Sequence, residues 1–237
     1  DGTLHARFRS VVVPAWASHW TNGTSVFWPV PDGCTPAWLL PDHQQIAAED
    51  GFVYGLCTTM IFRISVVPFG DPQVVTRFSA DLYAPAASIA VYSNGSVLIA
   101  GTMKSNNWSV FAGGEGQEAR GILSSSQCAS PTSLRIDGRT QNALITCRDS
   151  SSVLVLGSNG SVRAVGTADN LPCTWLRDAI TSAAFPDSYF VTCDGGVLRL
   201  RETVGDLRAD WIVSKRFCTP NDNMRFLFSR DGYTLFL

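Results

Sequence analysis

Short apolar runs that alternate with tight-turn motifs dominate the chain. Runs of Val, Ile, Leu, Phe, Tyr and Thr are bounded by Asn-Gly, Asp-Gly, Gly-Gly or Pro, which is typical of short strands joined by tight turns. Few segments show the i, i+3, i+4, i+7 apolar spacing of an amphipathic helix. The pattern therefore predicts an all-β protein.

The runs recur in the same order along the chain. Predicted first strands are Gln45–Asp50, Ser88–Ser93, Ser133–Gly138, Thr181–Asp187 and Arg225–Asp231. Second strands follow at Phe52–Cys57, Val97–Ala100, Ala143–Cys147, Tyr189–Cys193 and Tyr233–Leu237. Third strands are predicted at Ile61–Ser65, Trp108–Phe111, Val153–Leu156 and Val197–Leu200, and fourth strands at Val74–Phe78, Val162–Val165 and Trp211–Val213.

The spacing of these runs defines a repeat. Equivalent positions are assigned to Ile46, Ile89, Leu134, Ala183 and Leu227, and their spacings are 43, 45, 49 and 44 residues. Four short antiparallel strands in a unit of this length form a β-propeller blade. We therefore expect one all-β propeller domain over residues 1–237, with five or six blades, some of them stapled by an intra-blade disulfide. The predicted blades are about 43–84, 85–130, 131–177, 178–222 and an incomplete 223–237.

Residues 1–42 look irregular beside this repeat. Leu4–Val13 and Ser25–Val30 are candidate strands. They either supply outer strands that close the ring or belong to a further blade.

The seven cysteines follow the same period. Cys128, Cys173 and Cys218 are 45 residues apart and precede a first strand, as Cys34 does, whereas Cys57, Cys147 and Cys193 end second strands. The simplest scheme pairs Cys34–Cys57, Cys128–Cys147 and Cys173–Cys193 within their blades. Each bridge would close a loop of about 20 residues and stabilise the fold by roughly 3 kcal/mol. Cys218 has no such partner before Leu237, so we expect the chain to continue. The alternative is a free or intermolecular thiol.

Composition indicates the compartment. The cysteines are joined by four Asn-x-Ser/Thr sequons, at Asn22, Asn94, Asn107 and Asn159, and both features are typical of the secretory pathway. A net charge of −2 indicates no nucleic-acid surface, and no apolar run is long enough to span a membrane. We expect an extracellular or cell-surface protein that reaches a membrane only through an anchor outside this segment.

Several segments resemble the NHL-repeat propellers. They are Pro85–Ala100, Trp108–Gly116, Pro131–Asp137 and Asn159–Thr167. The family pattern is Pro, an apolar strand ending near Asp, a Gly turn, a second strand, then Val-Phe and a glycine-rich link. The usual Asn-His or Asn-Arg after the second strand is replaced by Lys104-Ser-Asn-Asn and Asp149-Ser-Ser-Ser.

The glycosylated, cysteine-stapled, Ala/Ser/Val-rich composition is also similar to that of kinetoplastid flagellum-attachment glycoproteins. This resemblance implies a place at the flagellar membrane and adhesion to a partner glycoprotein on the facing membrane.

Candidates for catalysis are sparse. His5, His19 and His43 lack the spacing of a metal site, and no Gly-x-Ser-x-Gly elbow surrounds a serine. The glycine-rich Gly113–Gly116 lacks the Lys-Ser/Thr of a phosphate loop. We therefore predict no catalytic residue, no metal and no cofactor.

Tryptophans are the main candidates for binding. Trp16, Trp20, Trp28 and Trp38 are close in sequence and either form an exposed patch or pack over the N-terminal segment. Trp108 and Trp175 are expected to pack between blades.

We expect a binding module whose partner is a protein, namely another surface glycoprotein. The loops after the first and third strands are expected to form the binding face. The alternatives are a lectin that uses the N-terminal tryptophans, or a lyase or hydrolase with its site on the propeller axis.

Overall fold

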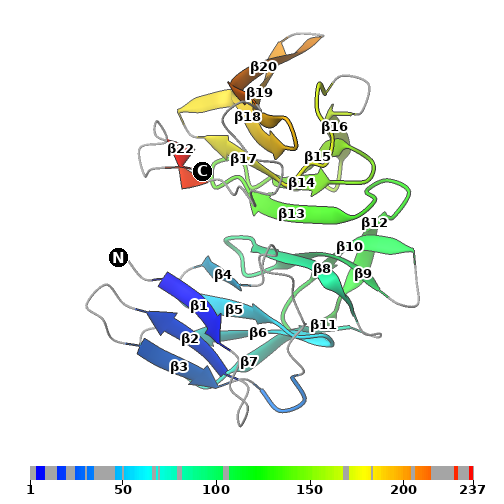
Figure 1. Ribbon diagram of the computed structural model, residues 1–237. Helices are drawn as coiled ribbons and strands as arrows, with labels where there is room; N and C mark the ends of the chain where they lie inside the picture. The colour runs from blue at the N-terminus through cyan, green and yellow to red at the C-terminus, as the bar shows by residue number, and fades with distance from the viewer. Residues whose placement is uncertain are drawn as a thin grey trace.

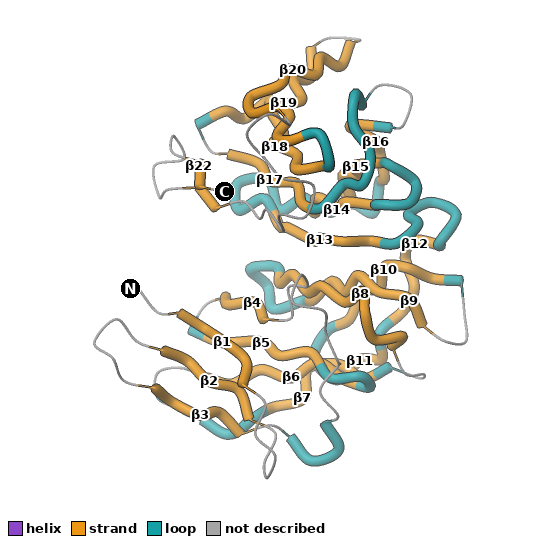
Figure 2. The backbone as a smooth tube through the Cα atoms, viewed as in Figure 1, coloured by secondary structure: helices purple, strands orange, loops and turns teal. Residues whose placement is uncertain are grey.

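The computed structural model describes the repeat region and short strands on either side of it. The described residues are 4–8, 15–19, 25–29, 31–34, 46–49, 51–65, 68, 70–78, 82–103, 107–167, 171–182, 184–203, 206–214, 227–228 and 235–236. Every regular element among them is a β-strand (Figure 2), which confirms the all-β prediction. A search of the same residues for a helix able to cross the bilayer finds none.

Four consecutive antiparallel sheets follow one another along the chain, as Figure 1 shows from the cyan strands to the orange ones. We call them blades 1 to 4. Blade 1 contains β4 (Ile46–Glu49), β5 (Phe52–Leu56), β6 (Met60–Ser65) and β7 (Gln73–Arg77). Blade 2 contains β8 (Leu82–Val91), β9 (Val97–Met103), β10 (Trp108–Gly113) and β12 (Arg120–Ser124). Blade 3 contains β13 (Pro131–Ile136), β14 (Ala143–Cys147), β15 (Ser152–Leu156) and β16 (Val162–Gly166). Blade 4 contains β17 (Asp178–Ser182), β18 (Phe185–Cys193), β19 (Gly196–Thr203) and β20 (Asp206–Ser214).

Shorter sheets lie at the two ends of the chain. At the N-terminus, β1 (Leu4–Phe8), β2 (Ala15–His19) and β3 (Ser25–Pro29) form a three-stranded antiparallel sheet. At the C-terminus, β21 (Leu227–Phe228) pairs with β22 (Leu235–Phe236). Within the described residues, β1–β3 pair with one another and not with β21 or β22.

The core consists of apolar layers between neighbouring blades. Ile99 and Phe111 of blade 2 pack against Leu56 and Ile61 of blade 1. The middle strands contact a neighbour on both faces, so strands such as β14 are buried at every position. This explains why the middle strands read as continuous apolar runs rather than as alternating ones.

The strand register corrects one position of the predicted repeat. In blade 3, Leu134 lies opposite Ile145, two residues before Cys147. In blade 4, the residue opposite the equivalent Val191 is Ala179, so Ala179 and not Ala183 corresponds to Leu134. The predicted first strand Thr181–Asp187 is therefore wrong. The spacing between blades 3 and 4 becomes 45 residues.

Disulfides join the start of a blade to the end of its second strand. The bonded pairs are Cys34–Cys57, Cys128–Cys147 and Cys173–Cys193, the same pairs that the repeat predicts. Cys218 lies outside the described residues. Disulfides persist in oxidising compartments, so the three bridges indicate a secreted or extracellular protein.

One hairpin of blade 2 extends onto the preceding blade 1. The turn between β10 and β12 contains β11 (Gln117–Glu118), which adds to the outer strand β7 of blade 1 in parallel. Thr76 Oγ1 donates a hydrogen bond to the Gln117 carbonyl oxygen at 2.7 Å. Blade 2 is thus tied to blade 1 at the outer edge as well as through the core.

Candidate functional site

The turns of each blade divide between two faces. Connections after first and third strands lie at one end of an antiparallel meander, and we call this end the hairpin face. The other end contains the three disulfides and is called the disulfide face. Hydrogen bonds align the hairpin turns of successive blades: Ser93 Oγ donates to Gln141 Oε1 at 2.8 Å, and Arg139 donates to the Pro186 carbonyl oxygen at 3.5 Å.

Two predicted sequons occupy the same kind of turn on the hairpin face. Asn94 and Asn159 are exposed, and each Oδ1 accepts a hydrogen bond from the amide of the serine two residues later, at 3.0 and 2.9 Å. Gly95 and Gly160 both have φ +81°, a conformation that glycine adopts without strain. Glycans on these asparagines would extend into solvent from this face.

The third described sequon has a different setting. Asn107 is exposed just before β10, at the disulfide end of blade 2. The Ser109 hydroxyl is buried and donates to the Ser124 carbonyl oxygen at 3.1 Å. Since this hydroxyl is enclosed in the folded chain, modification of Asn107 would have to precede folding. Asn22 lies outside the described residues.

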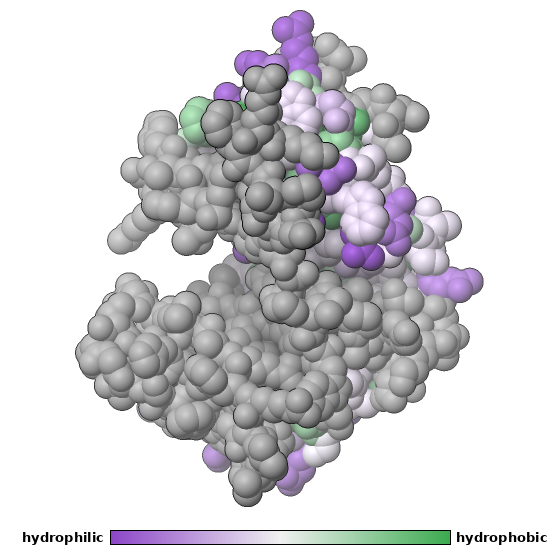
Figure 3. Space-filling model, in the orientation of Figure 1, coloured by the Kyte–Doolittle hydropathy of each residue, from purple (hydrophilic) through white to green (hydrophobic). Residues whose placement is uncertain are grey.

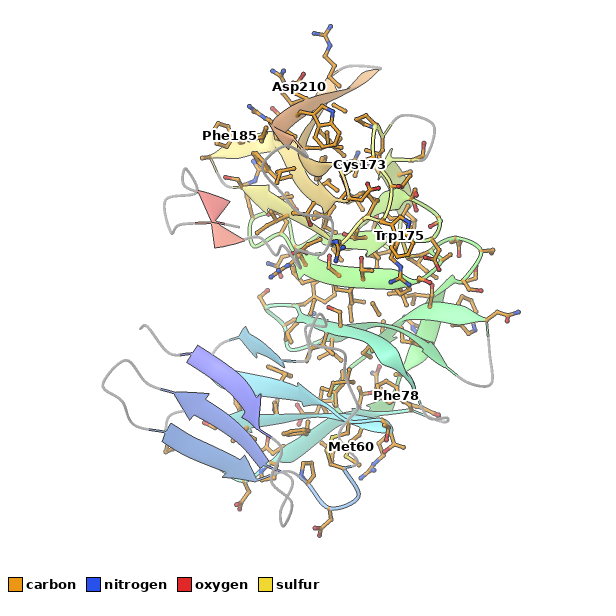
Figure 4. All side chains as sticks on the ribbon, in the orientation of Figure 1. Met60, Phe78, Cys173, Trp175, Phe185 and Asp210 are labelled. Atoms are coloured by element: carbon orange, nitrogen blue, oxygen red, sulfur yellow. A yellow bond between two sulfur atoms is a disulfide. The ribbon has the colours of Figure 1, made fainter. Side chains whose placement is uncertain are left out.

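The exposed side chain of Trp175 lies on the disulfide face. Trp175 is 60% exposed, and its loop begins at Cys173, which bonds to Cys193. Figure 4 shows Trp175 and Phe185 at opposite sides of the ribbon. The described surface in the space-filling view is mostly hydrophilic or intermediate, with small hydrophobic areas (Figure 3). Trp175 is thus the most exposed of three exposed tryptophans among the described residues, the others being Trp108 and Trp211.

Two carboxylates hold the groups around Trp175 in place. Asp194 accepts from the amide and the hydroxyl of Thr174, both at 3.0 Å. Asp149 accepts from the Ser130 hydroxyl and from Arg148 Nε. The Ser130 hydrogen bond, assisted by Arg148, lowers the pKa of the Asp149 carboxyl.

The side chain of Arg148 lies over the Trp175 ring. Its guanidinium carbon lies 5.4 Å from the centre of the Trp175 ring, within the range of a cation–π contact. Among described partners, Arg148 donates a side-chain hydrogen bond only from Nε. The same contact is an ion pair with the Asp149 carboxylate, and the terminal nitrogens donate to no residue that the structure describes.

Tryptophans account for the main differences between prediction and structure. Trp16 and Trp28 occupy opposed backbone positions on β2 and β3, whereas Trp20 and Trp38 lie outside the described residues. Trp108 and Trp175 are not buried between blades, contrary to the prediction: Trp175 is 60% exposed, although Arg148 of blade 3 lies over its ring. Trp108 is 40% exposed and its ring lies against Gly121 of the same blade.

The site residue Trp175 could have been identified from the repeat. It follows Cys173 by two positions, as Ser130 follows Cys128, and the two residues are 45 positions apart. A small polar residue at the equivalent position indicates that the chain does not need an apolar side chain there.

Groups that could hold a metal ion do not cluster in the described part of the chain, where no three His, Cys, Asp or Glu side chains come together. His5 and His19 lie on the paired strands β1 and β2, and His43 falls outside the described residues.

Comparison with known proteins identifies the fold. No family model matches the chain, and no curated protein matches its sequence. Among solved structures, streptogramin B lyase aligns with a TM-score of 0.57 and 13% identity over 90% of this chain. A putative 6-phosphogluconolactonase from Bacteroides fragilis aligns with a TM-score of 0.60 and 13% identity, covering 98% of this chain and 72% of its own length. The nidogen/laminin complex contains a match with a TM-score of 0.56 and 14% identity, covering 87% of this chain and 76% of that one.

The chain spans only 64% of the length of streptogramin B lyase. The neighbours are β-propeller proteins, and identities this low show the fold alone. The described blades, their antiparallel sheets and these neighbours together show a β-propeller of four-stranded blades.

Proposed function

We propose that this propeller is an extracellular adhesion module that binds a glycoprotein on a facing cell surface. The observation that carries the proposal is Trp175, an exposed aromatic side chain on a loop stapled by the Cys173–Cys193 bridge. Trp and Arg dominate the binding energy of many protein interfaces, and Trp175 has Arg148 beside it. Exposed sequons support a position outside the cell.

The finer assignment is an NHL-type propeller that acts in flagellum attachment. Support for the NHL pattern comes from blades 2 and 3, where Pro85 precedes the apolar part of β8 and Pro131 begins β13. Support for the flagellar location comes from composition alone. A fluorescent fusion that lies along the contact between flagellum and cell body would agree with it, and a uniform or intracellular signal would contradict it.

Adhesion can be measured with beads coated with the secreted, glycosylated chain and mixed with the cells that produce it. Beads coated with the same chain after reduction and denaturation are the control. We expect the native beads to attach, and protease treatment of the cells to abolish attachment.

The same assay separates the alternatives. Attachment blocked by free sugars but not by protease would favour a lectin. Failure of native beads to exceed the control would contradict adhesion, and turnover of an added lactone or macrocyclic ester that is lost with a chelator would favour an enzyme.

A further inference from the structure

Trp175 has a backbone conformation that its residue type does not favour. Its φ is +52°, and Ser130, at the same repeat position in blade 3, has φ +50°. Small polar residues enter this left-handed region more readily than bulky ones. The repeat therefore requires a left-handed residue here, but a serine meets that requirement. The indole ring is not explained by the fold.

The loop around Trp175 is held from both sides. Asp194 donates its backbone amide to the Thr174 carbonyl oxygen at 3.2 Å and accepts two hydrogen bonds from Thr174. On the other side, Leu176 is fully buried and its carbonyl oxygen accepts a hydrogen bond from Thr132 at 3.2 Å. An exposed ring on a rigid loop loses little conformational entropy when a partner covers it.

The polar groups beside the ring favour one kind of ligand. Both oxygens of Asp194 and both oxygens of Asp149 already accept hydrogen bonds from the chain itself. A sugar site needs acceptors for hydroxyl groups as well as an aromatic platform. Here each carboxylate oxygen already has one donor from the chain, whereas the Arg148 terminal nitrogens donate to no described residue. Guanidinium donors pair best with a carboxylate.

We propose that Trp175 and Arg148 form a docking site for a protein segment with an apolar side chain next to a carboxylate. The apolar group would cover the indole and the carboxylate would bind the Arg148 terminal nitrogens. This inference rests on the proposed adhesive function and assigns it to the disulfide face. The loops after the first and third strands, expected from sequence to bind, instead contain the sequons Asn94 and Asn159.

The test uses random peptides displayed on phage and selected on the immobilised, folded chain. We expect the enriched peptides to contain Asp or Glu next to an aromatic or aliphatic residue. We expect the Trp175→Gly variant to bind them at least about tenfold more weakly. The matched control is Trp108→Ala, which removes another exposed tryptophan, 40% exposed at the start of β10 in blade 2, and should bind the peptides as the parent does.

Stability provides a second readout. Glycine suits a positive φ, so Trp175→Gly should unfold at the same or a higher guanidinium concentration. A structural tryptophan would give the opposite result. If Trp175→Gly unfolds more readily, binding of the same peptides to the Arg148→Gln variant is measured instead. The proposal requires this variant to bind the acidic peptides more weakly than the parent does.

Three outcomes overturn the proposal. These are peptides that bind Trp175→Gly as tightly as the parent, enriched peptides without acidic residues, and Trp175-dependent binding of arrayed glycans in place of peptides. Native beads that fail to attach to cells while acidic peptides still require Trp175 would reject adhesion and leave the docking site standing. If beads coated with Trp175→Gly attach to cells as well as the parent does, adhesion stands and Trp175 is rejected as its docking site.

Discussion

Blades 2 and 3 have the same four-stranded plan but hold their first two strands together differently. In blade 3, Cys128 before β13 bonds to Cys147 at the end of β14. Blade 2 has no cysteine, and β8 and β9 instead continue their backbone pairing through Tyr83↔Thr102 and Leu82↔Met103. A longer β-ladder therefore lies where the other blades have a covalent bond.

Their buried hydroxyl groups differ as well. In blade 3, Ser133 Oγ and Thr146 Oγ1 lie 3.0 Å apart and share a hydrogen bond. In blade 2 the corresponding register pairs Ser88 with Ala100. Ser88 Oγ is consequently the one buried side-chain oxygen or nitrogen of the described residues that has no hydrogen-bond partner.

The joints between blades show the same contrast. Between blades 3 and 4, Arg135 Nη2 lies 2.8 Å from Asp178 Oδ2, whose side chain is fully buried. The position equivalent to Arg135 in blade 2 is Ala90, which belongs to the apolar layer shared with blade 3. The comparison teaches that the repeat preserves apolar positions and strand order, while each blade uses its own polar or covalent links.

Loss of the Arg135–Asp178 pair should have the largest effect. We expect Asp178→Ala to lower the free energy of unfolding by about 3 kcal/mol, because breaking one partner of a buried pair leaves a charge uncompensated. Guanidinium denaturation followed by tryptophan fluorescence measures the loss. Asp178→Ser combined with Arg135→Ala, the residues of the blade 2–3 joint, should recover most of it. A double variant as unstable as Asp178→Ala would show that the joints are not interchangeable.

Removal of a disulfide should have an effect of about the same size. We expect Cys128→Ala with Cys147→Ala to lose roughly 3 kcal/mol, since the bridge restricts the unfolded chain. Hydrogen exchange under dithiothreitol provides the comparison between blades. Amides of Leu82–Met103 should keep their protection, whereas those of β13 should lose part of theirs. Equal loss in both blades would mean that the ladder of blade 2 depends on its neighbour's bridge.

The sequence was sufficient for the repeat because apolar runs and cysteines have the same period. It failed at Ala183 for a local reason. The β17–β18 hairpin is irregular, with Thr181 opposite Tyr189 but Ser182 opposite Phe185. The extra apolar residues between the two strands read as a strand when only their type is considered. The short strand β11 could not be predicted from the sequence either, because its pairing with β7 depends on contact between two blades.

Sequence alone led to the expectation that Trp175 packs between blades, because burial was inferred from residue type. Trp175 is large and apolar, yet its left-handed backbone and the disulfide-stapled loop leave it exposed. Arg148 lies 27 positions earlier in the chain, and only the folding of blade 3 against blade 4 places it on the ring. The repeat period identifies Trp175 as the equivalent of Ser130, but the contact between Arg148 and Trp175 can be found only from the three-dimensional structure.

Smaller effects are expected for the buried hydroxyl groups. Ser133→Ala should lose about 1 kcal/mol, because it leaves the buried Thr146 hydroxyl without its partner. Ser88→Ala removes an unpaired hydroxyl and should be neutral or stabilising by up to about 1 kcal/mol. Paired urea denaturation curves measure both. If the two variants lose the same stability, the proposed difference between the blades is wrong at this position.

The smallest effect should come from the hairpin that ties blade 2 to blade 1. Arg63 Nη2 lies 3.1 Å from Glu115 Oε2, but the Glu115 side chain is 71% exposed. Exposed ion pairs contribute about 0.2–1 kcal/mol and weaken with salt. We therefore expect Glu115→Gln to lower stability by a few tenths of a kcal/mol at low salt and by less in about 1 M NaCl. Thr76→Val is the comparison: it removes the part-buried 2.7 Å hydrogen bond to the hairpin backbone and should lose about 1 kcal/mol at either salt concentration. A larger loss for Glu115→Gln than for Thr76→Val would mean that the surface charge, and not the added strand, holds the hairpin on blade 1.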